Sequence, residues 1–196
     1  MSIEYLDHLP ERFRAQAAQL YLDSLKEKLL PVLGPEKKAR QVVSESIFPD
    51  QCLAALYREN LVGIMGIQTK GAGFMSPDLK TMIKYYGISS GTLRLGGLSL
   101  LNHGAGENEV YVEGVAVAQE MRGKGIGSAM FHVLEKQALG MGIQTLSLEV
   151  VDTNPKARAL YEKLGFVHKK TQAIWPLNHF VGFPFQSSTL MIKTIG

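Results

Sequence analysis

The 196-residue sequence contains a single cysteine, Cys52, and little that is typical of a secreted or membrane protein. One cysteine excludes an internal disulfide and any zinc or iron–sulfur site that needs several cysteine ligands. The N-terminal segment MSIEYLDHLPERFR has no apolar stretch of the signal-peptide type. The uncharged run over residues 171–192 contains prolines and amide side chains that do not belong in hydrocarbon. We therefore expect a cytoplasmic protein that does not associate with membranes.

An excess of charge of one sign is also absent, because 21 Lys and Arg residues face 18 Asp and Glu residues, for a net charge of +3. This small excess does not predict a nucleic-acid partner. The five histidines show no spacing typical of metal ligands, so we expect no bound metal. Hydrophobic residues make up 45% of the chain, enough for a packed core, and no repeat or linker is apparent. Residues 1–196 are therefore expected to form a single domain.

The first half of the chain predicts helices and one β-hairpin. Apolar residues recur at helical spacing over residues 10–33, and Pro31 and Gly34 are expected to end that helix. A second helix is predicted over residues 36–47. Two apolar runs around the charged turn Arg58-Glu59-Asn60 predict a hairpin over residues 52–68.

The region over residues 71–106 is harder to interpret. Ser76 as N-cap and Pro77 at the first helical position predict a helix that ends near Gly87. The leucines of TLRLGGLSLLN fit neither the helical nor the strand period, so a helix and a strand both remain open there. The aromatic segment over residues 174–185 is expected either to cover a substrate site or to cap the sheet.

The second half alternates strands and helices clearly. Asn154 followed by Pro155 predicts a helix start, because asparagine caps the first turn and proline is well tolerated at the first helical position. The elements follow the order strand, helix, strand, helix and two closing strands, over residues 109–117, 125–139, 143–151, 155–164, from 166 onward, and 186–194. This alternation predicts an α/β sheet with parallel pairing at its centre.

A glycine-rich segment joins the strand over residues 109–117 to the next helix. Every second position there is a glycine, at Gly123, Gly125 and Gly127. Several backbone N–H groups can therefore approach one anion without interference from Cβ atoms. The helix N-terminus already favours negative charge, and Arg122 and Lys124 add two cations. The segment therefore predicts a pyrophosphate-binding loop.

The spacing fits neither of two common phosphate motifs. A dinucleotide-binding G-x-G-x-x-G would need glycine where Ser128 stands, and a P-loop would need glycine where Ala118 stands. A turn that only joins strand to helix is the alternative, but three glycines and two cations favour anion binding.

Two motifs resemble those of the GNAT family of N-acetyltransferases. Arg122-Gly123-Lys124-Gly125-Ile126-Gly127 matches the acetyl-CoA-binding signature Arg/Gln-x-x-Gly-x-Gly/Ala without a gap. A second family block is matched by Asn154, Ala157, Leu160, Tyr161, Gly165 and Phe166. Together they cover a cofactor-binding core of about residues 109–168. The resemblance implies a mixed α/β (α+β) fold, with a mostly antiparallel sheet, central parallel strands that splay apart, and flanking helices.

The resemblance also implies a binding site for acetyl-CoA as co-substrate. The strand would pair with the pantetheine arm, the loop would hold the pyrophosphate, and Asn154 would bind or orient the pantetheine. The role of Asn154 as a helix N-cap is equally compatible. An N–H group near Val117 would stabilise the oxyanion. The implied binding residues are Val115, Ala116, Val117, Arg122, Gly123, Lys124, Gly125, Ile126, Gly127, Ser128, Asn154 and Tyr161.

Tyr161 and Glu113 are the candidate catalytic residues. By the resemblance, Tyr161 would protonate the departing thiolate, and its alternative is a tyrosine that only packs on the sheet. Glu113 lies beside Gly114, which suggests a β-bulge that re-aims its neighbours. Glu113 would take the proton of the acceptor amine, or would only bind a cationic substrate or face solvent; both interpretations stay open.

The implied reaction is direct transfer of an acetyl group from acetyl-CoA to an acceptor amine in a ternary complex. The acceptor would be a small molecule or a peptide, and its identity is not indicated. Transfer of a longer acyl group, or a non-catalytic CoA-binding sensor, are the alternatives, although the presence of Tyr161 argues against the sensor. A homodimer is left open.

Overall fold

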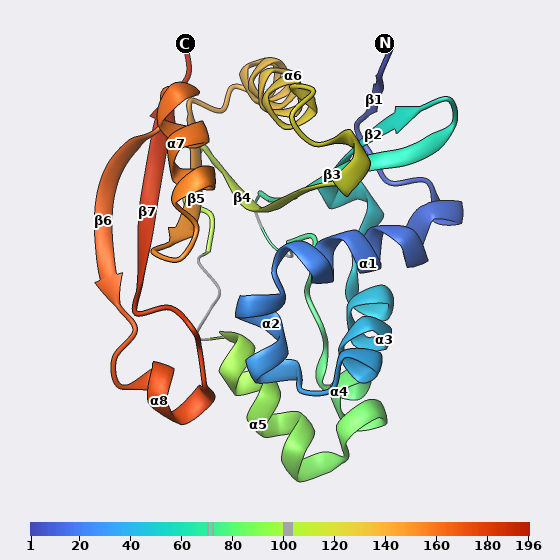
Figure 1. The fold of residues 1–196 in the computed structure, drawn as a ribbon, viewed down its shortest axis with the longest axis vertical. Helices are drawn as coiled ribbons and strands as arrows, with labels where there is room; N and C mark the ends of the chain where they lie inside the picture. The colour runs from blue at the N-terminus through green and yellow to red at the C-terminus, as the bar shows by residue number, and fades with distance from the viewer. Residues whose placement is uncertain (70, 72, 100–103) are drawn as a thin grey trace.

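The computed structural model describes residues 1–69, 71, 73–99 and 104–196, and within them the chain builds one seven-stranded sheet (Figure 1). The strands lie in the order β1-β2-β3-β4-β5-β7-β6. Their bounds are β1 (Glu4–Leu6), β2 (Cys52–Tyr57), β3 (Asn60–Gln68), β4 (Glu109–Val117), β5 (Thr145–Val151), β6 (Val167–Ala173) and β7 (Ser187–Thr194).

Only the β4–β5 pair is parallel, and every other neighbouring pair is antiparallel. The parallel register runs from Glu109 opposite Thr145 to Val112 opposite Leu148. Beyond Val112, β4 continues along β3 while β5 continues along β7, so the two central strands separate. The predicted mixed, mostly antiparallel sheet with splayed central parallel strands is confirmed.

The predicted β-bulge is also present in β4. Gly66 pairs with Gly114, but the next residue of β3, Ile67, pairs with Val112. Glu113 is therefore the extra residue of the bulge, which bends the strand where β4 and β5 separate.

The bulge places Glu113 and Gly114 on the same face of the sheet. The Tyr21 hydroxyl lies 3.5 Å from a Glu113 oxygen. A Cβ atom built on Gly114 would lie 2.9 Å from Leu25 and 3.2 Å from Tyr21. Glycine at this position therefore allows the first helix to pack directly on the strand.

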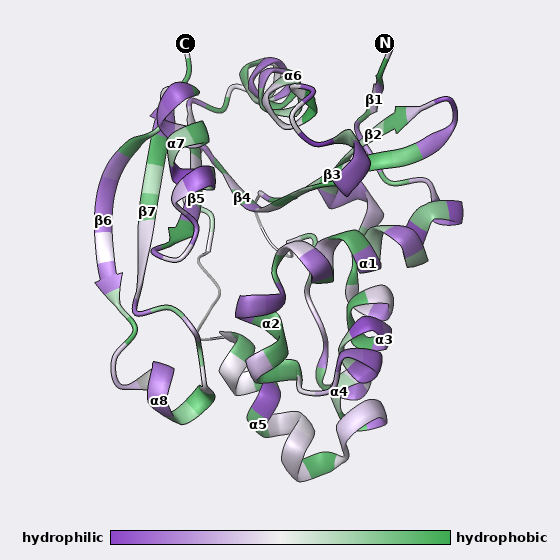
Figure 2. Cartoon of the chain, viewed as in Figure 1, coloured by the Kyte–Doolittle hydropathy of each residue, from purple (hydrophilic) through white to green (hydrophobic). Residues whose placement is uncertain are grey.

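Helices cover both faces of the sheet. One face carries α1 (Arg14–Ser24), α2 (Lys26–Leu33), α3 (Glu36–Ser46), α4 (Leu79–Tyr86) and α5 (Ile88–Ser99), and the other carries α6 (Ile126–Gly140) and α7 (Pro155–Lys163). Each side has its own apolar core, and Figure 2 shows that hydrophobic and hydrophilic stretches alternate along these helices. Short 3-10 turns occur at η1 (Glu11–Phe13), η2 (Pro49–Gln51) and η3 (Gln119–Met121).

The helix predicted over residues 10–33 is divided in two. Leu25 leaves helical geometry at φ −115° and ψ 18°, so α1 ends before it and α2 starts after it. Pro31 lies inside α2 and does not end it. Proline has a helical φ, and because it lacks a backbone N–H, only one helical hydrogen bond is lost. Gly34, with φ 74°, ends the helix as predicted.

The start of α4 also differs from the prediction. Asp78, and not Ser76, caps the helix by accepting a hydrogen bond of 2.7 Å from the N–H of Thr81. The Ser76 hydroxyl instead accepts a bond of 3.1 Å from the N–H of Gly73. Residues 92–99 are helical and belong to α5, which settles the choice left open for them; residues 100–102 of the same segment lie outside the described part.

The other predicted elements agree with the structure within two residues, whereas β1 and α8 were not predicted. The hairpin of β2 and β3 turns at Arg58 and Glu59, which have positive φ angles of 49° and 62°. The aromatic segment forms α8 (Leu177–Val181) and contributes Phe183 and Phe185 to the core beneath α1 to α5. In the described ranges, no helix has the length and apolar character needed to span a membrane.

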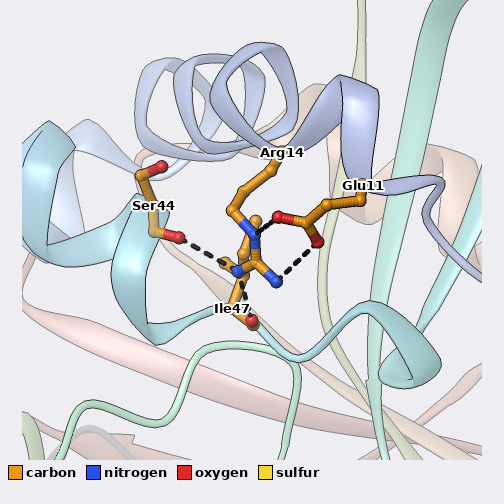
Figure 3. A network of polar contacts seen from close by, with 4 residues as sticks. All are labelled: Glu11, Arg14, Ser44 and Ile47. Atoms are coloured by element: carbon orange, nitrogen blue, oxygen red, sulfur yellow. Dashed lines mark hydrogen bonds and ion pairs between the residues drawn. The ribbon is translucent and has the colours of Figure 1, made fainter.

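Arg14 fixes the position of α1 relative to α3 (Figure 3). Its Nη1 donates to the carbonyl oxygens of Ser44 at 3.1 Å and Ile47 at 2.9 Å, at the C-terminal end of α3. Its other side is held by the Glu11 carboxylate. One guanidinium thus satisfies carbonyl groups that the helix end leaves without partners. The contact holds α1 where it covers β4.

Candidate active site

A groove of about 580 Å³ lies at the N-terminus of α6. Gly123 and Gly125 have positive φ angles of 75° and 79°, and Cβ atoms built on Gly123, Gly125 and Gly127 would meet no atom within 4 Å. Within the described residues, the N–H groups of residues 123–128 have no hydrogen-bond acceptor. Free donors, an open space and the positive end of a helix form a binding site for an anion.

Most of the predicted cofactor residues lie around this groove. It is lined by Val115, Val117, Arg122, Gly123, Gly125, Ile126, Gly127, Ser128, Asn154 and Tyr161, together with Asp23, Ser24, Met121, Phe131, Ala157 and Leu160. Ala116 and Lys124 are not among the lining residues. Ala116 is buried in the core beneath α1, and the Lys124 ammonium lies 3.4 Å from the Met121 sulfur. The Arg122 guanidinium donates to the carbonyl oxygen of Val117 at 3.0 Å.

The groove continues into a slot of about 350 Å³ where β4 and β5 separate. Residues 112–115 form one wall, residues 148–151 form the other, and residues 23–28 cover it. Asn154 and Tyr161 line both the groove and the slot. The Asn154 side chain caps α7 by accepting a bond of 3.1 Å from the N–H of Ala157, so its predicted role as an N-cap is confirmed.

Tyr161 is held by other aromatic rings. It makes edge-to-face contacts with Phe131 and Phe166, at centroid distances of 5.7 Å and 6.1 Å. Burial raises the pKa of the Tyr161 hydroxyl to about 12, so the group remains protonated at neutral pH. Tyr161 therefore packs on the core and also lines the slot.

A cavity of about 200 Å³ lies at the far end of the slot. Leu25, Lys28 and Glu113 line both spaces, which makes groove, slot and cavity one continuous path. The other lining residues are Tyr21, Leu29, Met75, Ser76, Pro77, Leu95, Leu98, Ser99 and Tyr111.

Glu113 is enclosed at the junction of slot and cavity. Its Oε2 accepts a hydrogen bond of 3.1 Å from the N–H of Met75, and a Cβ atom on Gly73 would lie only 1.5 Å from its Oε1. Burial raises the pKa of Glu113 to about 7, and its hydrogen bonds and the nearby Lys28 only partly oppose that shift. A carboxylate that titrates near neutral pH can accept a proton from a substrate.

The cavity residues of the first half were not predicted from the sequence. The available signal was helical spacing, because four of them follow the i, i+4, i+7, i+8 positions of one helical face: Tyr21, Leu25, Lys28 and Leu29. The aromatic segment over residues 174–185 supplies none of the described lining residues; Phe183 and Phe185 pack on the core, whereas Trp175 and Phe180 are exposed.

Other chemistry has little support in the described part of the chain. Cys52 is buried, burial raises the pKa of its thiol to about 12, and it lines none of these three spaces. No group of three or more His, Cys, Asp or Glu side chains is placed to hold a metal ion among these residues.

Comparison with known proteins agrees with this geometry. The model of the acetyltransferase (GNAT) family matches residues 20–166. The chain belongs to the GNAT family. It is 36% identical over 90 residues to the uncharacterized N-acetyltransferase YobR of Bacillus subtilis, covering 46% of this chain and 34% of that protein. It is 41% identical over 56 residues to the thialysine N-epsilon-acetyltransferase of Bos taurus, covering 29% of this chain and 33% of that protein.

The chain thus spans about a third of the length of these curated relatives. Solved structures support the GNAT fold over the whole chain. One acetyltransferase has a TM-score of 0.63 at 21% identity, and both chains are fully covered. The PaiA N-acetyltransferase of Thermoplasma acidophilum, solved with coenzyme A, has a TM-score of 0.58 at 16% identity, with 99% of each chain covered.

The raised pKa of Glu113 predicts a pH-dependent stability. Because the folded-state pKa of about 7 exceeds the ordinary value of 4.5, the folded protein binds the proton more tightly than the unfolded chain. The tighter binding of the proton adds up to about 3 kcal/mol to the free energy of unfolding. This contribution is complete below pH 4.5 and is lost as the pH rises through about 7. Glu113→Gln is expected to remove that decline, measured by urea unfolding at several pH values. Parallel curves for the two proteins would contradict the assignment.

Proposed function

We propose that this protein transfers an acetyl group from acetyl-CoA to an amine by direct attack in a ternary complex. The observation that carries the proposal is the continuous path from the anion-binding groove, through the slot, to a cavity with a buried carboxylate. Membership of the GNAT family supports it. The solved complex of the PaiA N-acetyltransferase with coenzyme A supports the same donor class.

The residues present fit coenzyme A. The free N–H groups of residues 123–128 and the Arg122 guanidinium would hold the pyrophosphate at the helix N-terminus. Val115 and Asn154 line the groove and the slot, and they would hold the pantetheine. Bound there, acetyl-CoA supplies an activated thioester.

Glu113 and Tyr161 would divide the proton transfers. Glu113 would accept the proton that the acceptor amine loses, directly or through water, since its pKa of about 7 suits a base at neutral pH. As the new C–N bond forms and the C–S bond breaks, Tyr161 would give its proton to the sulfur. An N–H group near Val117 would stabilise the charge on the carbonyl oxygen.

Direct transfer agrees with the position of the chain's single cysteine, which does not reach the described site. Cys52 is the first residue of β2 and is buried in the core, and its thiol is protonated at neutral pH. A covalent acyl-enzyme would need an activated thiol or hydroxyl next to the slot.

Thiol release from acetyl-CoA, measured against a panel of amines, tests this function. We expect amine-dependent release and an acetylated amine detected by mass spectrometry. Faster release from longer acyl-CoA donors would identify a different acyl group. CoA binding without release, for every amine and donor, would indicate the sensor alternative.

The groove itself is tested by Gly127→Val. The added side chain would fill the open space at the helix N-terminus, so CoA affinity measured by calorimetry is expected to fall at least about tenfold. Gly140→Val is the matched control, because it makes the same change at the other end of α6, where a Cβ atom also meets nothing within 4 Å. Equal affinity of the two variants would exclude this groove as the CoA site.

The proton donor is tested by Tyr161→Phe, which keeps the ring contacts and removes only the hydroxyl. Turnover is expected to fall roughly 10²-fold, with acetyl-CoA affinity nearly unchanged, because the lost interaction belongs to the transition state. Tyr5→Phe is the control, since Tyr5 packs on the same core but lines none of the three spaces. Full turnover in Tyr161→Phe would leave Tyr161 a packing residue.

A further inference from the structure

Within the described part of the chain, the Lys28 ammonium group lies at the junction of slot and cavity without a hydrogen bond. Its side chain is only 16% exposed, and its ion pair with Glu149 has an N–O distance of 3.8 Å, beyond hydrogen-bond length. No other described residue accepts a hydrogen bond from it. Buried ammonium groups normally have hydrogen-bonded partners, because losing water is costly for a charge.

Lys28 is held at this place by the fold. It lies one turn after Leu25, where α1 gives way to α2, and it lines both the slot and the cavity. Burial lowers the pKa of Lys28, while the carboxylates of Glu149 and Glu113 act in the opposite direction. An anionic group placed beside it would supply the missing hydrogen bonds and would favour the charged form.

The rest of the cavity is mainly apolar. Beyond Lys28 and Glu113, no charged side chain is found among its described lining residues. The other walls are formed by leucines, Met75 and Pro77, by the rings of Tyr21 and Tyr111, and by two serines. None of the six residues outside the description is acidic. A polyamine would need a second carboxylate for its far ammonium group, and the cavity does not offer one.

We propose that the acceptor is a free α-amino acid with an apolar or aromatic side chain. Its amine would lie beside Glu113, its carboxylate would bind Lys28, and its side chain would enter the cavity. The proposal rests on the proposed function: the amine nitrogen bonds to the acetyl carbon, the C–S bond breaks, and the products are an N-acetyl amino acid and the CoA thiol. A space of about 200 Å³ suits a molecule of this size.

Substrate pairs that differ only in the carboxylate test this assignment. L-Leucine is compared with 3-methylbutylamine, and L-phenylalanine with phenethylamine, in the wild-type protein and in Lys28→Met. We expect kcat/KM for each amino acid to fall roughly 10- to 100-fold in Lys28→Met, with little change for the amines. Differences in amine basicity cancel, because the same pair is measured in both proteins. Lys28→Arg is expected to restore part of the preference.

Lys193→Met is the matched control. Lys193 is also a mostly buried lysine paired with a glutamate, Glu135, but it does not line the cavity. It should leave the ratio between amino acid and amine unchanged. CoA affinity and the melting temperature of Lys28→Met report whether that variant is folded.

The outcomes separate this proposal from the proposed function. Equal losses for amines and amino acids in Lys28→Met would overturn the carboxylate assignment, as would a wild-type preference for polyamines or peptide N-termini. If no amine gives thiol release, the proposed acetyl transfer is wrong. The amino-acid subsite is then tested separately, by calorimetry of L-leucine and L-phenylalanine binding to the CoA-loaded protein. Binding that is lost in Lys28→Met supports the subsite, and no binding to the wild type overturns it.

Discussion

The site depends on one constraint in the sheet: β4 pairs with β5 only as far as Val112. Because β4 stays on β3 while β5 stays on β7, the strands must separate, and their separation opens the slot. The bulge falls at the same point, and Glu113 is its extra residue. A regular strand would alternate its side chains and place residues 113 and 114 on opposite faces. The irregularity of β4 thus creates a space between the strands and places a carboxylate beside it.

The two faces of the sheet contribute different parts of the site. The anion-binding loop, Asn154 and Tyr161 come from short contiguous segments on the side of α6 and α7. The cavity comes from α1, α2, α5 and the segment before α4, which meet only in the folded chain. Arg14 contributes indirectly, because it ties α1 to the end of α3 and so fixes the helix that packs on Gly114.

This difference explains what the sequence could predict. The loop over residues 122–128 and the Asn154 cap are local features. Glycine permits the positive φ angles of the loop, and asparagine caps a helix through an N–H group only a few residues away. The bulge was also visible, because Gly114 interrupts a β-prone run. Lys28 shares the helical spacing of Tyr21 and Leu25, but its loss of water and the approach of Glu113 arise only in the folded chain. The break at Leu25 and the cap at Asp78 likewise depend on packing and on competition between neighbouring side chains, which periodicity does not describe.

Gly73 has a consequence for how such a site can diverge. The space of its absent side chain is filled by the Glu113 carboxylate, so a larger residue there would displace the carboxylate. Greater exposure to water would lower the pKa of Glu113 toward its ordinary value. Position 73 therefore bears on the basicity of Glu113, a residue far from it in the sequence, and does not line the groove. A change in the connection after β3 could alter the surroundings of Glu113 while the glycine-rich loop before α6 stays intact.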